Sequence, residues 1–349
     1  MKRLKLIKLI TCFFITVSCF IFAQTTSDTW WNVYFTNPGG TSKTALTKIT
    51  PEKALVQLIQ TTQESFYAAF YDLNSVPVVK ALISAKKRGI DIRIITDDSN
   101  YNNAVISEIQ TNGIPVISDG RKGLMHNKFA IIDGKILWTG SYNVTSNGEN
   151  RNNNNAIAIH STELADIYYA EFSEMFDLGV FGNKKEPGVF GGISKKYYVK
   201  IDETNINAYF APDDNVENII IDRIKKAKTS IHFMAFSFTS DGIGEAMIEM
   251  FHKGVKVAGL FERQGAKSKD SEFTKMKVEG IPVRLDSNKY AMHHKVIIID
   301  DYRLITGSYN FSKNASQRND ENCLMIDNAE ISTLYIKEFE KLYKTGKTQ

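Results

Sequence analysis

The stretch MHNKFAIIDGKILWTGSYN occupies residues 125–143, and MHHKVIIIDDYRLITGSYN occupies residues 292–310. A gapless alignment of residues 125–155 with residues 292–322 gives 16 identities in 31 positions. The polar residues recur, while most of the apolar residues change from one copy to the other. Chance does not produce such a match, so the chain contains two copies of one structural unit.

The repeat extends beyond these two stretches. NVYFTNP at Asn32 resembles NAYFAPD at Asn207. Residues 179–196 are rich in glycine and lysine, a composition that is typical of a linker between units. These features predict two lobes, at residues 24–185 and 186–349.

Each copy shows the same order of expected secondary structure. In the first copy, helical spacing in PEKALVQLIQTTQ precedes the strand SFYAAFYD, the helix VVKALISAKKRG and the strand IDIRIIT. The second copy repeats this order as VENIIIDRIKKAK, SIHFMAFSF, IGEAMIEMFHKG and VKVAGLF. Strands that alternate with helices predict an α/β layer in each half. Two further strands, joined at Asp133-Gly134 or at Asp300-Asp301, predict a β-hairpin in each sheet.

Residues 1–23 are not expected to belong to this fold. Four basic residues precede an apolar run from Leu9 to Phe22, and Ala23 is a small residue at the expected cleavage site. This pattern is typical of a secretory signal peptide. The apolar run is shorter than the roughly 20 residues of a spanning helix, which favours cleavage over a retained anchor. The sequence therefore predicts an exported protein, periplasmic or secreted, with membrane anchoring as the alternative.

Removal of this segment changes the charge balance. The chain has 43 basic and 39 acidic residues, but residues 1–23 hold four basic and no acidic ones, which leaves 39 of each sign. A balanced chain offers no electrostatic argument for binding nucleic acid. Cys12 and Cys19 lie in the same segment, so only Cys323 remains. An internal disulfide and a multi-cysteine metal site are therefore excluded.

The polar residues of the repeated stretch suit an anion. In an extended segment, residues i and i+2 point the same way, so His126 and Lys128 share one face, as do His293 and Lys295. The second strand of each hairpin ends in Gly-Ser-x-Asn, which supplies a backbone turn, a hydroxyl and an amide as donors. The two sets are Gly140, Ser141 and Asn143, and Gly307, Ser308 and Asn310. An imidazole, an ammonium group and neutral donors together predict a phosphate site.

Each of these residues also has a simpler interpretation. A single His-x-Lys pair on a strand is most often a solvated face, but two pairs in register argue against that interpretation. Asp133 and Asp300, at the hairpin tips, suit turn stabilisation at least as well as chemistry. A zinc site is not expected, because the adjacent His293 and His294 diverge on a strand and lysine is not a usual ligand.

The pattern His-x-Lys-x4-Asp-x6-Gly-Ser-x-Asn resembles the HKD signature of the phospholipase D superfamily, and both copies are complete. The resemblance implies an α/β fold of two similar lobes, each a mixed β-sheet flanked by helices, related by pseudo-twofold symmetry. It implies one active site where the two motifs meet. It also implies that phosphodiesters are cleaved or transferred through a phosphohistidine, with no metal and no cofactor, while Lys128 and Lys295 neutralise the phosphate oxygens.

The two copies differ at one position that matters in this family. A carboxylate eleven residues after the motif asparagine often orients a catalytic imidazole of the other lobe. That position holds Glu321 in the second copy and Asn154 in the first. The resemblance therefore implies that Glu321 orients His126 as the nucleophile. It leaves His293 as the acid, with Asn154 as its support.

The sequence leaves the substrate open. The export signal, the balanced charge and the aromatic residues near the motifs favour a phospholipid and contact with a membrane surface. The resemblance also favours an alternative, because compact, exported members of the superfamily include non-specific nucleases. The repeated Arg151 and Arg318 beside the site likewise favour a nuclease. A cardiolipin-synthase-like transferase and a non-catalytic phosphate-binding module are further alternatives, but intact His and Lys residues in both motifs favour an enzyme. We expect a monomer that is internally a pseudo-dimer.

Overall fold

The computed structural model describes residues 29–182 and 197–348, apart from residue 42, together with the short strands β9 (Val189–Phe190) and β10 (Ile193–Ser194). The predicted signal peptide and the predicted lobe boundary at residues 185 and 186 lie outside the described residues. Within these described segments, no helix is both long enough and apolar enough to cross a membrane.

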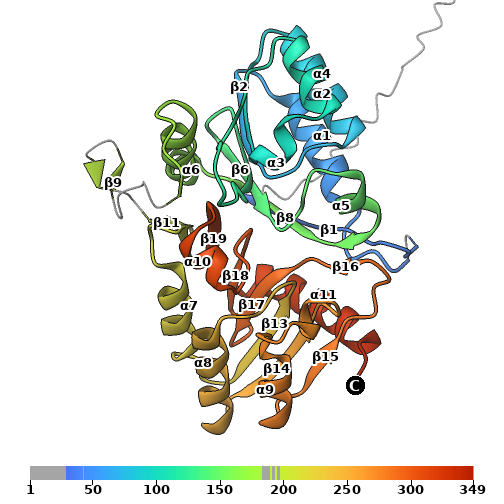
Figure 1. Cartoon of the computed structure of the whole chain (residues 1–349), viewed down its shortest axis with the longest axis vertical. Coiled ribbons are helices and arrows are strands. Elements are labelled where there is room, and N and C mark those ends of the chain that lie inside the picture. The colour runs from blue at the N-terminus through green and yellow to red at the C-terminus, as the bar shows by residue number, and fades with distance from the viewer. Residues whose placement is uncertain (1–28, 42, 183–188, 191–192, 195–196, 349) are drawn as a thin grey trace, which may run out of the picture.

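The first lobe is a seven-stranded sheet with helices around it (Figure 1). Its strands are β1 (Trp31–Phe35), β2 (Ser65–Phe70), β3 (Asp91–Thr96), β4 (Val116–Ser118), β5 (Lys128–Ile132), β6 (Ile136–Gly140) and β8 (Asn155–His160). Its helices are α1 (Pro51–Thr61), α2 (Val76–Lys87), α3 (Asp98–Tyr101), α4 (Ala104–Thr111), α5 (Ser146–Asn150) and α6 (Thr162–Phe176). The spatial order is β1-β8-β6-β5-β2-β3-β4. Strands β2, β3 and β4 run parallel and the other pairs are antiparallel, so the sheet is mixed.

The second lobe is an eight-stranded sheet of the same design. Its strands are β11 (Tyr198–Ile201), β12 (Thr204–Ala211), β13 (Ser230–Ala235), β14 (Lys256–Phe261), β15 (Val283–Leu285), β17 (Lys295–Ile299), β18 (Arg303–Gly307) and β19 (Glu321–Asp327). Its helices are α7 (Val216–Ile224), α8 (Asp241–His252), the 3₁₀ helix η2 (Gly265–Lys267), α9 (Glu272–Val278), α10 (Lys313–Gln317) and α11 (Ala329–Thr345). The order β11-β12-β19-β18-β17-β13-β14-β15 repeats that of the first lobe with one added edge strand. The predicted fold class is confirmed.

Several helices begin where the sequence offers a capping side chain. Ser75 and Ser240 stand before α2 and α8, and each hydroxyl accepts a hydrogen bond from a backbone N–H of the first turn. Thr145 and Ser312 cap α5 and α10 in the same way. A capped first turn satisfies donors that would otherwise lack a partner. The matching caps therefore start the matching helices at the same place in both lobes.

The predicted hairpins are β5–β6 and β17–β18. Their turn residues Asp133, Gly134, Asp300 and Asp301 have φ angles of 52°, 59°, 55° and 52°, the left-handed conformation that suits the twist of a two-residue hairpin. The carboxylates of Asp133 and Asp300 each accept hydrogen bonds from three consecutive backbone N–H groups that lead into β2 or β13. The motif aspartates therefore tie each hairpin to the neighbouring strand.

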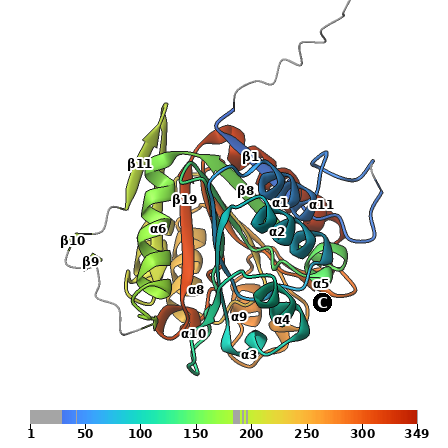
Figure 2. The same cartoon turned by 90° about the horizontal axis from the view of Figure 1, so that it is seen from above.

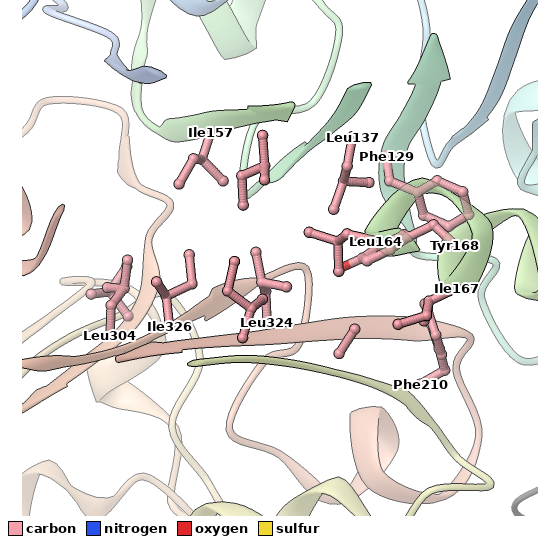
Figure 3. Close-up of a cluster of buried hydrophobic side chains, with 14 of the residues drawn as sticks. Phe129, Leu137, Ile157, Leu164, Ile167, Tyr168, Phe210, Leu304, Leu324 and Ile326 are labelled. Carbon is pink, nitrogen blue, oxygen red and sulfur yellow. The ribbon is translucent and has the colours of Figure 1, made fainter. Parts of the chain in front are cut away.

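The apolar side chains form three clusters. Two outer clusters lie between each sheet and its covering helices, and the third lies between the two sheets, with residues of α6 and α11. Figure 3 shows Leu137 and Ile157 of the first lobe facing Leu304, Leu324 and Ile326 of the second. Helices α6 and α11 flank this shared core from opposite sides (Figures 1 and 2). Full burial of each Leu or Ile stabilises the fold by roughly 1.5–3 kcal/mol, so the lobes pack as one unit.

Just before each HKD hairpin, the backbone of one lobe pairs with the backbone of the other. Strand β16 (Ala291–Met292) of the second lobe pairs in parallel with β7 (Asn152–Asn153) of the first. A parallel bridge between Met125 and Asp320 is the counterpart on the other side of the interface. The next residue in each copy is the motif histidine. Both of these backbone contacts therefore place a histidine at the junction of the lobes.

The motif glycines leave no room for a side chain. A Cβ added at Gly140, where φ is 150°, would lie 2.4 Å from Asn155 O and 2.8 Å from Ala156 Cα, both in the backbone of β8. We therefore expect Gly140→Ala to lower the free energy of unfolding by about 3 kcal/mol or more, measured by chemical denaturation. The matched control is Gly134→Ala, where φ is also positive but the added Cβ has no heavy atom within 4 Å. That control should cost only about 1 kcal/mol. Equal losses would contradict the close-packing explanation.

Candidate active site

His126 and His293 lie at the junction of the two lobes. The backbone N–H of each donates to a carbonyl of the other lobe, to Asp320 O and Asn153 O respectively, both at 2.9 Å. Both histidines are only 7% exposed. Burial is the main cause that lowers the pKa of each ring well below its usual value.

The motif lysines belong to the same cluster. Lys128 Nζ donates to His126 O at 2.7 Å, and Lys295 Nζ donates to His293 O at 2.9 Å. Burial lowers the pKa of Lys128 to about 7 and that of Lys295 well below its usual value. Each ammonium group also lowers the pKa of both histidine rings. The structure therefore brings both His-x-Lys pairs into one site.

Two aromatic side chains that sequence reasoning missed form walls of this site. Tyr71 directly follows β2, and its ring centroid lies 5.0 Å from that of His126. Phe236 directly follows β13, and its centroid lies 4.6 Å from that of His293. The motif lysines Lys128 and Lys295 stand 5.0 Å and 4.6 Å from the same two centroids, within range of cation–π attraction. The available signal was an aromatic residue immediately after the same strand in both copies.

His126 faces a carboxylate of the other lobe. Glu321 Oε2 lies 2.7 Å from His126 Nδ1. Ser308 Oγ donates to the same oxygen at 2.6 Å, and Asn319 Nδ2 donates to Oε1 at 3.1 Å. Burial raises the pKa of Glu321, while the ammonium group of Lys128 and the hydrogen bonds from Ser308 and Asn319 favour its charged form. With Nδ1 engaged by a carboxylate, Nε2 is the ring nitrogen available for chemistry, and a positive charge on the ring is stabilised.

His293 faces neutral oxygens instead. Its Nδ1 lies 3.0 Å from Asn154 Oδ1 and 3.1 Å from Ser141 O. Asn154 Nδ2 donates to Gly148 O in α5 at 3.0 Å, which turns its Oδ1 toward the histidine. The two rings therefore occupy equivalent positions, but only His126 has a carboxylate partner.

Ser141 and Ser308 differ from the expectation that they bind substrate phosphate. Both side chains are fully buried, and their hydroxyls donate to Asn154 Oδ1 at 3.0 Å and to Glu321 Oε2 at 2.6 Å. Their backbone N–H groups donate to carbonyls of the neighbouring strand. Strand pairing at this point turns both hydroxyls into the interior. The motif serines therefore hold the side chains that orient the histidines.

Asn143 and Asn310 fit the expected role of phosphate binding better. Each is partly exposed, and each Oδ1 is buried without a hydrogen-bond partner among the described residues. Buried polar atoms normally have partners, so the matching unpaired oxygens suit a ligand that carries a hydrogen-bond donor, while the amide Nδ2 is the group that can donate to a phosphate oxygen. Asp133 and Asp300 lie at the turns of the hairpins and take no part in this cluster.

Within residues 29–182 and 197–348, no three or more His, Cys, Asp or Glu side chains are grouped so that they could hold a metal ion. Two ammonium groups, those of Lys128 and Lys295, lie in the same cluster as both histidines.

Comparison with known proteins places both lobes in one family. The family model described as cardiolipin synthase, PLD-like domain, matches residues 55–176 and 220–343. A phospholipase D of Rickettsia prowazekii is 32% identical over 140 residues, which are 40% of this chain and 68% of that protein. A mitochondrial cardiolipin hydrolase of Mus musculus is 33% identical over 118 residues, which are 34% of this chain and 53% of that protein.

The fold is shared with a solved structure as well. The phosphatidylserine synthase of Haemophilus influenzae Rd KW20 has a TM-score of 0.67 at 14% identity, over 85% of each chain. Similarity at this level of identity shows the fold alone. The two family-model matches together cover more than half of the chain, and each contains one complete HKD motif. The chain therefore belongs to the phospholipase D superfamily, as a member with two PLD-like domains.

Proposed function

We propose that this protein hydrolyses phospholipids at a phosphodiester bond through a phosphohistidine on His126. The observation that carries the proposal is the unequal pair of histidines, one against the carboxylate of Glu321 and the other against the neutral amide of Asn154. Relatives named phospholipase D and mitochondrial cardiolipin hydrolase support phosphodiester hydrolysis at the level of the family, and they favour lipid as the substrate.

In the proposed first step, His126 Nε2 attacks phosphorus and forms a P–N bond. The P–O bond to the leaving alcohol breaks on the opposite side, and His293 gives a proton to that oxygen. Lys128 and Lys295 balance the charge on the non-bridging oxygens. Two imidazoles at a shared junction suit this in-line geometry, because each lobe delivers one of them.

In the proposed second step, His293 takes a proton from a water molecule whose oxygen attacks phosphorus. The P–N bond then breaks, and the electron pair returns to His126. The products are the free alcohol and a phosphomonoester, so atoms and charges balance over the two steps. His293 serves first as acid and then as base.

The partners of the two rings explain the division of tasks. The carboxylate of Glu321 stabilises a positive charge on His126, which rises when that ring bonds to phosphorus. Asn154 offers no charge to His293, so the imidazolium form of His293 is the stronger acid. A nucleophile and a proton donor therefore follow from a single difference between the copies.

A panel of substrates tests this function. Purified protein is offered phosphatidylcholine, cardiolipin, bis(p-nitrophenyl) phosphate and single-stranded DNA in parallel, with EDTA present. We expect hydrolysis of phospholipid and of the generic diester, because the lysines supply the positive charge. The double variant His126→Ala/His293→Ala, purified in the same way, controls for contaminating enzymes. Cleavage of DNA without cleavage of lipid would replace the proposal with a nuclease. Loss of activity in EDTA, restored by a divalent ion, would contradict the phosphohistidine route.

The proposal includes export through residues 1–23, which are expected to be a cleaved signal peptide. Terminal sequencing of protein recovered from outside the cytoplasm checks this. A start near Gln24 is the expected result, and an intact Met1 would favour the membrane-anchored alternative.

The lysines predict an alkaline limit to activity. Lys128 must be charged to hold phosphate, and burial lowers its pKa to about 7, so the charge is lost as pH rises through that value. We expect kcat/KM for bis(p-nitrophenyl) phosphate to fall above about pH 7, although free lysine keeps its charge to about pH 10. The bound anion favours the charged lysine, so kcat should fall only at higher pH. Lys128→Arg keeps the charge at this position, so only Lys295 then titrates and the fall in kcat/KM should become less steep. A flat profile to about pH 10 would contradict this prediction.

A further inference from the structure

The residue between His and Lys in each motif reaches into the lobe interface. Asn127 and His294 are both fully buried. Asn322 Nδ2 donates to Asn127 Oδ1 at 3.1 Å, and Asn155 Nδ2 lies 2.9 Å from His294 Nδ1. Each therefore contacts an asparagine of the other lobe, and these two asparagines occupy equivalent positions in the two copies. In both places the residue between His and Lys is placed to accept a hydrogen bond.

A chain of polar contacts leads from His294 to His293. Asn155 Nδ2 also donates to Ser141 Oγ at 3.2 Å. Ser141 Oγ donates to Asn154 Oδ1 at 3.0 Å, and that oxygen lies 3.0 Å from His293 Nδ1. All the residues of this path are buried. A change of hydrogen-bond direction at His294 can therefore be transmitted along these contacts to His293.

The direction of this chain is set by its neighbours. Asn155 Oδ1 accepts hydrogen bonds from Thr306 Oγ1 at 2.9 Å and from Tyr335 OH at 3.2 Å. This orients its Nδ2 hydrogens toward Ser141 and His294. A serine hydroxyl that accepts from Asn155 keeps its own proton for Asn154, whose oxygen is then an acceptor for His293.

The chain runs this way only if His294 Nδ1 carries no proton. His294 Nε2 lies 3.5 Å from Glu338 Oε1, and neither atom has a hydrogen-bond partner among the described residues. Both side chains are fully buried, and Lys341 Nζ holds the other carboxylate oxygen of Glu338 at 3.1 Å. A proton on Nε2 therefore faces a carboxylate, and Nδ1 is left as an acceptor. Burial also lowers the pKa of His294, which favours the neutral ring.

We propose that His294 and Glu338 are positioning residues for His293. Glu338 holds His294 in the tautomer that is protonated on Nε2. The chain through Asn155, Ser141 and Asn154 then presents Asn154 Oδ1, beside the backbone carbonyl of Ser141, as an acceptor for Nδ1 of His293, and Nε2 is directed to the substrate. In the first copy, Asn127 takes the place of His294, and its amide oxygen accepts a hydrogen bond whatever the protonation state of its neighbours. The catalytic part of this inference rests on the proposed function, whereas the tautomer does not.

Nitrogen NMR of protein labelled with ¹⁵N-histidine tests the tautomer directly. The chain has six histidines, and the signal that is lost in His294→Asn identifies His294. We expect His294 near neutral pH to be uncharged with its proton on Nε2. A charged ring, or a proton on Nδ1, would overturn the inference. This measurement needs no substrate, so it stands even if the protein has no phosphodiesterase activity.

Kinetics of His294→Leu test the positioning role. Leucine fills a similar space but cannot accept a hydrogen bond, so His293 loses its orientation. We expect kcat for an alkyl phosphodiester to fall about 10–100-fold, with KM changed less than about twofold. On bis(p-nitrophenyl) phosphate, whose leaving group needs little protonation, the first step, measured as the rate of the p-nitrophenol burst, should lose less than about threefold. His294→Asn supplies the acceptor of the first copy and should recover most of the lost kcat.

Asn127→Leu is the matched control in the first copy. It acts on the side of His126, so it should slow both esters by the same factor. If His294→Leu also slows the first step on both esters equally, its role is structural and the inference fails. Circular dichroism and the melting temperature check that each variant is folded. If His294→Leu is unfolded, Glu338→Gln takes its place, with the same expected difference between the two esters.

Discussion

His126→Ala will lose activity on every phosphodiester, by roughly 10⁴-fold or more, because no P–N bond forms without this ring. The carboxylate of Glu321 lies 2.7 Å from its Nδ1, whereas Nδ1 of the other motif histidine, His293, faces the neutral amide of Asn154. A leaving group that needs no proton does not rescue the variant, since attack on phosphorus is the step that is lost. The loss should therefore be the same on an alkyl ester and on a p-nitrophenyl ester.

Rapid-quench kinetics measure this result. The wild-type protein should release a burst of p-nitrophenol and trap a phosphoryl label on His126, and the variant should do neither. His160→Ala is the control, because His160 is exposed at the end of β8 and outside the cluster. A label found on His293 in the wild-type protein would reverse the assignment.

His293→Ala will separate substrates by their leaving groups. An alkyl or choline ester needs a proton on the departing oxygen, so its hydrolysis should fall roughly 10²- to 10⁴-fold. A p-nitrophenyl ester leaves without that proton, so its first step should continue. The second step needs His293 as base, and the phosphohistidine on His126 should therefore accumulate. The expected record is a burst of p-nitrophenol followed by slow turnover.

The comparison of the two alanine variants decides the assignment. Equal losses on both esters for both variants would remove the evidence for separate roles. A burst that survives in His126→Ala and not in His293→Ala would make His293 the nucleophile. Asn154→Asp offers a further control, because a carboxylate beside His293 should weaken it as an acid and make the two halves more alike.

Much of the fold followed from local patterns in the sequence. The repeat predicted two lobes of the same class, and the apolar strands around Asp133 and Asp300 predicted the hairpins that the structure contains. Such patterns are visible in sequence because turns, helix caps and strand alternation depend on residues that are close along the chain. The two His-x-Lys pairs could be identified for the same reason.

The direction of the serine hydroxyls could not be predicted from residues that are close along the chain. Ser141 and Ser308 were expected to bind phosphate because Gly-Ser-x-Asn supplies a turn and a hydroxyl as donors. Pairing of their strands turns both hydroxyls inward, where they hold Asn154 and Glu321. The aromatic walls at Tyr71 and Phe236 were missed because only the three-dimensional arrangement places them against the histidines.

The sequence by itself determined that the chain is a duplicated α/β unit with two complete motifs. The resemblance to a family added that Glu321 faces His126, and the structure shows that contact at 2.7 Å, between residues 195 positions apart. Only the tertiary structure decided how far each charged group is buried, and therefore how its pKa moves. It also decided that Asn155 lies between Ser141 and His294. These properties depend on the packing of one lobe against the other, because the field around a buried group and the direction of its hydrogen bonds are set by neighbours that lie far away along the chain.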